Sequence, residues 1–276
     1  MTTIEIHGVS YHYELVGQGP AVLFGHCLTW NHHVFEAQVA ALAKDYTLIL
    51  PDQRGHGQTS YLPQPYTLDD MAQDLVALVQ QLDLGPVHYV GHSMGAMMGP
   101  ILALNHASAL RSMTLIGGSA APEAAQRLAG YRQLVAAVRA GHHAPVAERL
   151  VGLFFSKMSR ATRKAEIGRF MDDFAHISGE GLHWTAEAVF SRQDLRPQLS
   201  QIDLPTLVLV GAADGVTSPE QARELADGIP NARLLVLPRV GHFLPVEAPH
   251  TVTGALRDFW ESLPFSNAHL LKNVTV

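Results

Sequence analysis

Short apolar runs alternate with amphipathic segments along most of this 276-residue chain, and this alternation restricts the possible folds more than any other feature. Consecutive apolar positions are typical of strands that are buried on both faces. Such runs occupy residues 21–25, 47–50, 87–90, 113–116, 206–210 and 233–237, and helical spacing of apolar residues is found at 34–44, 68–82, 94–107, 219–229 and 246–263. The alternation predicts an α/β fold, with a mostly parallel, twisted sheet and helices on both of its faces.

Two local signals refine this prediction. Apolar residues alternate with polar ones at Ile4 and Ile6 and from Tyr11 onward, which predicts further strands at the start of the chain. Thr67 followed by Asp70 matches a capping box, so we expect a helix to begin there.

One stretch interrupts the alternation. Between residues 119 and 201, helical stripes begin near Tyr131, Leu150 and Ile167, and there is no convincing strand. Ligands of open α/β sheets bind at the carboxyl ends of the strands. We therefore interpret residues 119–201 as an inserted helical lid over those ends, with residues 1–118 and 202–276 forming the core.

The strongest functional signal is Gly91-His-Ser93-Met-Gly95, which lies between an expected strand and an expected helix. A Gly-x-Ser-x-Gly motif at such a junction is typical of a nucleophile elbow. The glycines allow a sharp turn that exposes the hydroxyl, and the following helix directs free N–H groups toward a developing oxyanion. We predict that Ser93 is a catalytic nucleophile, rather than part of an ordinary glycine-rich turn.

A serine nucleophile needs a base, and the base needs an acid that orients it. Asp214 follows the expected strand at 206–210, and His242 follows the next one at 233–237. Their side chains should reach the same edge of the sheet as Ser93, in the chain order serine, acid, histidine. We predict that His242 accepts the serine proton and that Asp214 orients the imidazole, although an Asp-Gly pair also favours a simple turn.

Charge and composition disfavour several other classes of protein. Nineteen Lys and Arg against twenty-five Asp and Glu give a formal net charge of −6, which disfavours nucleic acid and anionic membranes as partners. The sixteen histidines are scattered, and the pairs at 32–33 and 142–143 lack the ligand spacing of a zinc site. We therefore expect no metal and no cofactor.

The sequence also suggests where the protein acts. Its single cysteine, Cys27, excludes an internal disulfide and fits a reducing compartment. The first residues have neither the basic nor the apolar region of a secretory signal. The apolar stretch at 89–104 is too short for a membrane span. We expect a cytoplasmic monomer or homodimer whose partner is a small-molecule substrate.

In order and approximate spacing, these motifs resemble those of the α/β-hydrolase family over essentially the whole chain. The matching segments are Phe24-Gly-His26-Cys27-Leu28, Asp52-Gln-Arg-Gly-His-Gly57, the Ser93 motif, Asp214 and Gly241-His242. Within that family the chain is most similar to small esterases and lactonases, a group that includes the 3-oxoadipate enol-lactonases. The resemblance implies the α/β-hydrolase fold and a hydrolytic enzyme that requires no cofactor.

The resemblance further implies that the backbone N–H groups of Leu28 and Met94 form the oxyanion hole. Cys27 stands where the family usually has glycine, but backbone donors do not depend on the side chain. A backbone role for this position also argues against Cys27 as a rival nucleophile. The polar segment at 52–57 is interpreted as a hydrogen-bonded loop at a strand end rather than as a second catalytic cluster.

Four aromatic residues are expected to contact the substrate. They lie just after residues 26–28, which we call the oxyanion loop, within the lid, or next to the proposed base, His242. These residues are Trp30, Phe154, Trp184 and Phe243.

Together these features predict a carboxylic ester hydrolase that cleaves an ester or a lactone through an acyl-enzyme on Ser93. Two alternatives stay open, namely hydrolysis of a carbon–carbon bond by the same triad and a ligand receptor with slow turnover. Haloalkane dehalogenase and epoxide hydrolase chemistry are disfavoured, because those relatives have aspartate at the position of Ser93.

Overall fold

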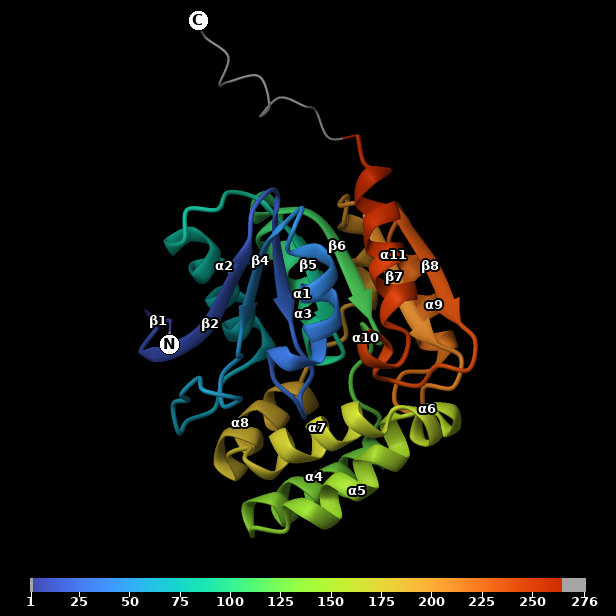
Figure 1. The fold of residues 1–276 in the computed structure, drawn as a ribbon. Coiled ribbons are helices and arrows are strands. Elements are labelled where there is room, and N and C mark those ends of the chain that lie inside the picture. The colour runs from blue at the N-terminus through green and yellow to red at the C-terminus, as the bar shows by residue number, and fades with distance from the viewer. Residues whose placement is uncertain (1, 265–276) are drawn as a thin grey trace, which may run out of the picture.

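The computed structural model describes residues 2–264, which form one eight-stranded sheet with helices on both faces (Figure 1). The strand order is β1-β2-β4-β3-β5-β6-β7-β8. β2 pairs antiparallel with both β1 and β4, and all the remaining pairs are parallel. The strands are β1 (Thr3–Ile6), β2 (Val9–Gly17), β3 (Ala21–Gly25), β4 (Thr47–Pro51), β5 (Val87–His92), β6 (Leu110–Ile116), β7 (Thr206–Gly211) and β8 (Ala232–Leu237). The predicted α/β fold with a mostly parallel sheet is confirmed.

The helices of the described chain connect these strands and cover the sheet. None of them is both long and apolar enough to cross a membrane. The α-helices are α1 (Glu36–Leu42), α2 (Leu68–Gln81), α3 (Met94–Asn105), α4 (Ala125–Arg139), α5 (His143–Phe154), α6 (Lys157–Thr162), α7 (Lys164–Ala175), α8 (Gly179–Phe190), α9 (Pro219–Gly228), α10 (Leu244–Glu247) and α11 (Pro249–Glu261), and the 3₁₀ helices are η1 (His32–Phe35), η2 (Ala107–Ala109) and η3 (Arg196–Gln201).

The apolar core has two parts, one on each side of the sheet. Successive residues of β3 face opposite sides, so Leu23 belongs to the buried cluster that includes residues of α2, α3 and α9, whereas Val22 and Phe24 belong to the one that includes residues of α1 and α11. This burial on both faces explains why the central strands are apolar at consecutive positions rather than at alternate ones.

Local sequence signals set the starts of two helices, α2 and α11. The side chain of Thr67 accepts the N–H of Asp70, and the Asp70 carboxylate accepts the N–H of Thr67, which confirms the predicted capping box of α2. The final helix predicted near 246–263 is α11, but it begins at Pro249, because Val246 and Glu247 belong to the short helix α10 and the chain breaks at Ala248. Pro249 has no N–H to donate and disfavours helical geometry in the residue before it.

Helices α4 to α8 follow one another between β6 and β7, and we call them the helical insertion. Figure 1 shows them lying together across the carboxyl ends of the parallel strands. Their position is the one expected of a lid. The proposed division into a core at 1–118 and 202–276 and a lid at 119–201 stays a prediction, and residues 265–276 lie outside the described part.

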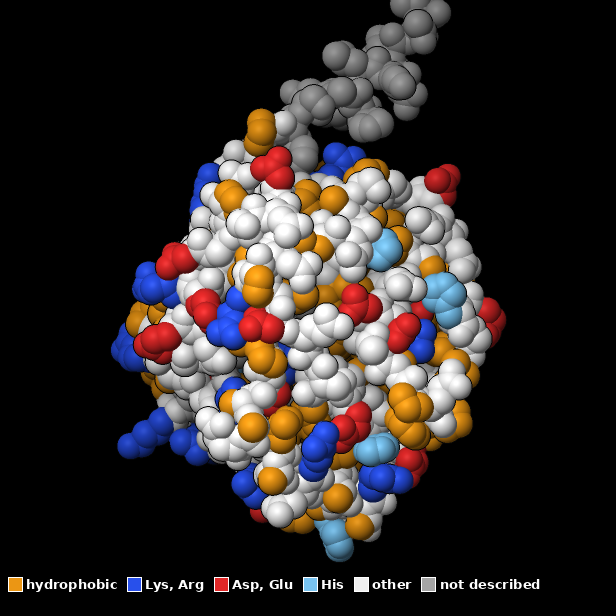
Figure 2. All heavy atoms as spheres, turned by 180° about the vertical axis from the view of Figure 1, so that it is seen from behind, with side chains coloured by type: hydrophobic (Ala, Val, Ile, Leu, Met, Phe, Trp, Pro, Cys, Tyr) orange, Lys and Arg blue, Asp and Glu red, His pale blue; other side chains and the backbone are white. Residues whose placement is uncertain are grey.

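Charged side chains of both signs share the surface. On the face shown in Figure 2, Lys and Arg side chains lie among Asp and Glu side chains rather than in a continuous basic area. Among the described residues, ion pairs join Arg132 with Glu187 and Arg196 with Glu224. This face offers no broad cationic footprint of the kind that nucleic acid requires, and the absence of nucleic acid as a partner stays a prediction.

Candidate active site

Ser93 lies on a tight turn between β5 and α3. Its backbone has φ of 53° and ψ of −109°, a positive-φ conformation that is strained for a residue with a side chain. A Cβ on Gly91 would overlap the backbone of Gly95, and one on Gly95 would overlap the backbone of Gly25. The two glycines of the motif therefore permit the close packing of β3, β5 and α3 that holds Ser93 in this conformation.

Asp214 and His242 follow the ends of the neighbouring strands β7 and β8, and both reach the turn that carries Ser93. Nε2 of His242 lies 2.9 Å from Oγ of Ser93, and Nδ1 of His242 lies 2.8 Å from Oδ2 of Asp214. With the Nδ1–H donated to Asp214, Nε2 is free to accept the hydrogen of the serine hydroxyl. The structure brings together the three residues that the motifs singled out.

The carboxylate of Asp214 has a hydrogen-bond partner on each oxygen. Oδ2 accepts from His242, while Oδ1 accepts from the backbone N–H groups of Val216 and Thr217 at 2.8 and 2.9 Å. Burial alone raises the pKa of Asp214, but the charge and hydrogen bond of His242, together with the two N–H groups, lower the pKa overall. Asp214 is therefore ionised at neutral pH and turned so that one oxygen faces the imidazole.

Two further residues hold the backbone of His242. Its N–H donates to the carbonyl of Phe154, at the end of α5, over 2.6 Å, and its carbonyl accepts from Nε2 of His92 over 2.9 Å. Burial lowers the pKa of His92 to about 3, so the His92 ring is neutral and can donate this hydrogen bond. The helical insertion and the residue before Ser93 thus both fix the position of His242, which sequence reasoning did not anticipate.

Leu28 and Met94 line the same pocket as Ser93. Met94 is the first residue of α3, where a helix leaves its N–H groups without an internal acceptor. Within the described chain, neither N–H donates to a protein acceptor. Two backbone donors without a protein acceptor, on residues that line the pocket of Ser93, suit the binding of an oxyanion.

Hydrogen bonds with the segment at 52–57 hold the loop that carries Leu28. The backbone N–H of Gln53 donates to Nε2 of His26 over 2.7 Å, so the other ring nitrogen of His26 donates to the carbonyl of Cys27. Nε2 of His56 faces the carbonyl of Leu28 and Nδ1 faces that of Arg54 at 2.9 Å, so the ring donates to one of these two carbonyls at a time. Burial lowers the pKa of His26 to about 3 and also lowers that of His56, which keeps both rings neutral. The segment at 52–57 therefore supports the loop through hydrogen bonds.

Cys27 is buried and lines the pocket, but its environment does not favour a thiolate. Burial raises the pKa of the Cys27 thiol to about 12. Its φ is not positive, unlike that of Ser93, so the side chain adds no backbone strain where the family has glycine. The thiol is thus neutral at physiological pH and is poorly suited to act as a nucleophile.

Replacing Cys27 by serine or glycine should lower kcat/KM by no more than about tenfold, or about 1.4 kcal/mol of transition-state stabilisation. The position supplies backbone shape, and neither substitution removes a backbone donor. Steady-state hydrolysis of an activated ester by the purified variants measures the effect. A loss as large as that of Ser93→Ala would instead identify Cys27 as the reacting group.

A mostly apolar pocket opens at Ser93 and extends beneath the helical insertion. It encloses about 790 Å³ of space free of atoms, its open mouth included. Its walls come from the oxyanion loop, α3 and the helical insertion. Apolar residues of the insertion that line it include Leu134, Val138, Val146, Leu150, Phe154 and Phe190.

Of the four aromatic residues expected to contact substrate, only Phe154 lines this pocket. Phe243 is fully buried behind the site, with its ring centroid 5.0 Å from that of Phe154 and 5.2 Å from that of Trp30. Nε1 of Trp30 donates to Asp173 on α7 over 2.8 Å. Trp184 packs against the other part of the core. Trp30, Trp184 and Phe243 thus pack between elements and do not line this pocket, and their contact with substrate stays a prediction.

A sheet of this order, with Ser93, His242 and Asp214 meeting at its carboxyl edge, defines an α/β hydrolase. Residues 20–249 match the model of the alpha/beta hydrolase fold family, and the chain belongs to this family.

Its relatives include several hydrolases. The 3-oxoadipate enol-lactonase 2 of Acinetobacter baylyi is 29% identical over 263 residues, which cover 93% of this chain and 97% of that protein. The 2-(acetamidomethylene)succinate hydrolase of Mesorhizobium japonicum is 27% identical over 266 residues, with 93% of each chain covered. A malate-bound thermophilic esterase from Thermogutta terrifontis superposes with a TM-score of 0.88 at 27% identity, covering 94% of this chain and 96% of its own. The expected likeness to esterases and lactonases is confirmed, and the chain is a hydrolase of this family.

Proposed function

We propose that the chain is a serine hydrolase that cleaves a carboxylic ester or a lactone. The observation that carries the proposal is the line of hydrogen bonds from Asp214 through His242 to Ser93, which ends at an apolar pocket beside two free backbone N–H groups. An ester carbonyl needs a nucleophile, a base and an oxyanion site, and this arrangement supplies all three.

The proposed reaction has two stages. Oγ of Ser93 attacks the carbonyl carbon as Nε2 of His242 takes the hydroxyl proton, and the N–H groups of Leu28 and Met94 stabilise the oxyanion. His242 then donates the proton to the leaving alkoxide, which leaves an acyl group on Ser93. Water attacks this acyl-enzyme with His242 again as base, and the free acid departs. Asp214 stabilises the imidazolium in both stages.

The charge of the pocket wall supports an uncharged acyl group as the preferred substrate. Among the described lining residues, Glu123 is the only Asp, Glu, Lys or Arg side chain. Its carboxylate pairs with Arg127 at 2.9 Å and with the buried Arg192 at 3.1 Å. Both arginines also donate to backbone carbonyls. A substrate carboxylate would therefore meet an anion, while the nearby cations already have partners.

The p-nitrophenyl esters of fatty acids should show kcat/KM that rises with chain length and then falls. Each added methylene contributes about 0.8 kcal/mol of burial, or about fourfold in kcat/KM, until the pocket is full. Half-esters of dicarboxylic acids should be poor substrates at matched chain length. Measurement of kcat/KM over both series tests the proposal.

Glu123→Gln gives this prediction a matched control. Removing the carboxylate leaves Arg127 and Arg192 without their acidic partner, so the variant should improve on half-esters relative to neutral esters. Glu187→Gln removes a partly exposed carboxylate that pairs with Arg132 outside the pocket, and it should leave this ratio unchanged.

The names of two relatives contain adipate and succinate, both dicarboxylates. A wild-type preference for half-esters would overturn the proposal and favour an anionic lactone instead.

The two alternatives differ in measurable ways. A carbon–carbon bond hydrolase would cleave diketones faster than activated esters, and a receptor would bind ligand with slow turnover even on activated esters. The pocket beside Ser93 supports an ester or lactone first, since no further catalytic group is needed. We further propose a cytoplasmic enzyme, monomeric or homodimeric, with a small-molecule substrate and no cofactor.

A further inference from the structure

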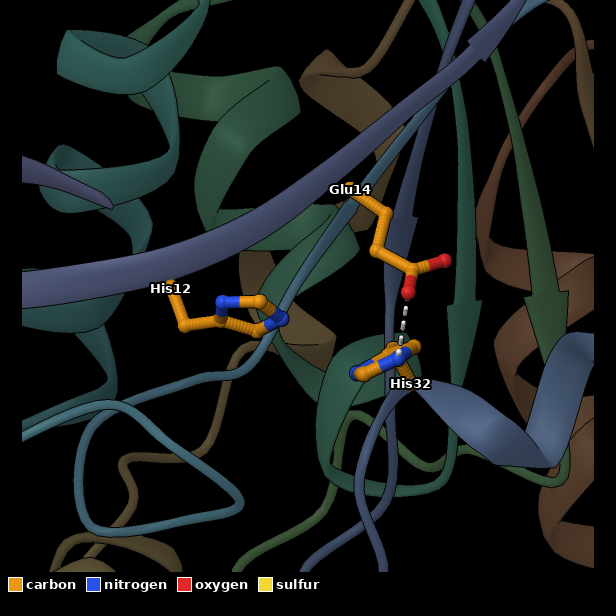
Figure 3. Close-up of side chains that lie close together, drawn as sticks. All are labelled: His12, Glu14 and His32. Atoms are coloured by element: carbon orange, nitrogen blue, oxygen red, sulfur yellow. Dashed lines mark ion pairs between the residues drawn. The ribbon is translucent and has the colours of Figure 1, made fainter. Parts of the chain in front are cut away.

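Three side chains that are distant from the pocket converge beside the second strand. His12 and Glu14 are two residues apart on β2, so their side chains leave the same face of the strand. His32 begins η1, which follows the oxyanion loop. Figure 3 shows the His12 ring and the Glu14 carboxylate directed toward the His32 ring. One ligand-capable atom from each residue lies within 4.8 Å of the other two.

The hydrogen bonds of His32 orient it toward this cluster. Nδ1 of His32 lies 2.6 Å from Oδ1 of Asp52, an ordinary site for an N–H donor. Nε2 then carries a free lone pair, and it is buried with no hydrogen-bond partner among the described residues. It faces Oε1 of Glu14 at 3.6 Å. A histidine whose other nitrogen donates to a carboxylate is the usual arrangement of a metal-binding imidazole.

We infer that His12, Glu14 and His32 form a binding site for a divalent transition metal, with Zn²⁺ as the cation that best fits two imidazoles and one carboxylate. The side chains of His12 and His32 are buried, whereas that of Glu14 is half-exposed. The metal can thus enter from solvent past Glu14. A water molecule would complete four-coordination.

The distances suit zinc after a small adjustment. Two ligands bound tetrahedrally at about 2.0–2.1 Å lie about 3.4 Å apart, close to the 3.6 Å between His32 and Glu14. No separation among the three ligand atoms exceeds 4.8 Å, so closing the cluster around zinc shortens any of them by at most about 1.4 Å. Nε2 of His12 has only a long contact of 3.3 Å with the amide of Gln58, which a metal would replace.

A bound metal would link β2 to the segment that follows the oxyanion loop. Asp52, which orients His32, lies in the same segment as Gln53 and His56, and both of these contact the loop that carries Leu28. The metal would therefore brace the loop from outside without touching the substrate. Its effect should be on stability first, and on hydrolysis only through the position of that loop.

Titration of the metal-free protein with Zn²⁺ in a calorimeter tests the site. We expect one high-affinity Zn²⁺ per chain and a higher thermal midpoint when zinc is present. Glu14→Gln and His12→Gln should each weaken binding by at least tenfold and reduce the thermal shift. Because Glu14 is half-exposed, its replacement should leave the metal-free midpoint close to that of the wild type.

Two controls separate this cluster from adventitious binding. Glu5→Gln removes an exposed carboxylate from β1, and His142→Gln removes an exposed histidine of the pair at 142–143. Both should bind Zn²⁺ like the wild type. Loss of binding in His142→Gln, equal binding by Glu14→Gln and wild type, or no zinc binding at all would each overturn the inference.

Discussion

Replacing Ser93 by alanine is expected to lower kcat by about 10⁶, as removal of a triad nucleophile does in other serine hydrolases. Oγ of Ser93 is the hydroxyl within hydrogen-bonding distance of Nε2 of His242. Alanine keeps the Cβ and the strained backbone of the turn, so the fold should be retained. The residual rate would come from the oxyanion site and from substrate binding.

Steady-state kinetics on an activated ester measures this loss, and a fluorophosphonate probe identifies the reacting residue. Mass spectrometry of the labelled protein should find the probe on the peptide that contains Ser93 and on no other. Ser119→Ala is the matched control, because Ser119 is also buried and lies just beyond β6. If Ser93→Ala kept most of the activity, or if the label lay elsewhere, the proposed mechanism would fail.

Replacing Asp214 by asparagine is expected to slow turnover by about 10⁴, for a reason that the local hydrogen bonds make specific. Oδ1 of Asp214 accepts two backbone N–H groups, from Val216 and Thr217. An asparagine in this place keeps those bonds only with its oxygen at that position, which turns its NH₂ toward His242. Nδ1 of His242 must then accept a hydrogen, so Nε2 carries the proton and cannot act as base toward Ser93.

Measurement of kcat for Asp214→Asn, with a thermal midpoint to establish folding, tests this tautomer argument. Asp227→Asn changes an exposed carboxylate at the end of α9 and should behave like the wild type. Wild-type turnover by Asp214→Asn would mean that Asp214 only shapes the turn after β7 and that another group orients His242.

The sequence determined the fold and the main residues of the site, because both depend on short-range patterns. Consecutive apolar residues mark strands that are buried on both faces, and parallel strands place their carboxyl ends at one edge. Ser93, Asp214 and His242 each follow such an end, so their meeting was predictable once the strands were identified. The backbone donors at Leu28 and Met94 could be expected from family resemblance alone.

The tertiary structure decided which side chains surround these residues. Trp30 and Phe243 are near site residues in sequence and Trp184 belongs to the expected lid, yet all three pack between elements, since an aromatic side chain buries as well in the core as in a pocket. Glu123 and its two arginines have no motif. Arg127 is only four residues from Glu123, but Arg192 lies far along the chain, and its pairing with Glu123 appears only in the folded structure.

The cluster of His12, Glu14 and His32 illustrates the same limit. The sequence offered two adjacent histidine pairs, neither with the spacing of a metal site, and on that basis no metal was expected. The structure instead joins one histidine of a pair to two residues of β2. Sequence spacing predicts ligands that lie on one helix, strand or loop, whereas ligands from separate elements depend on how those elements pack, which the chain's local patterns do not specify.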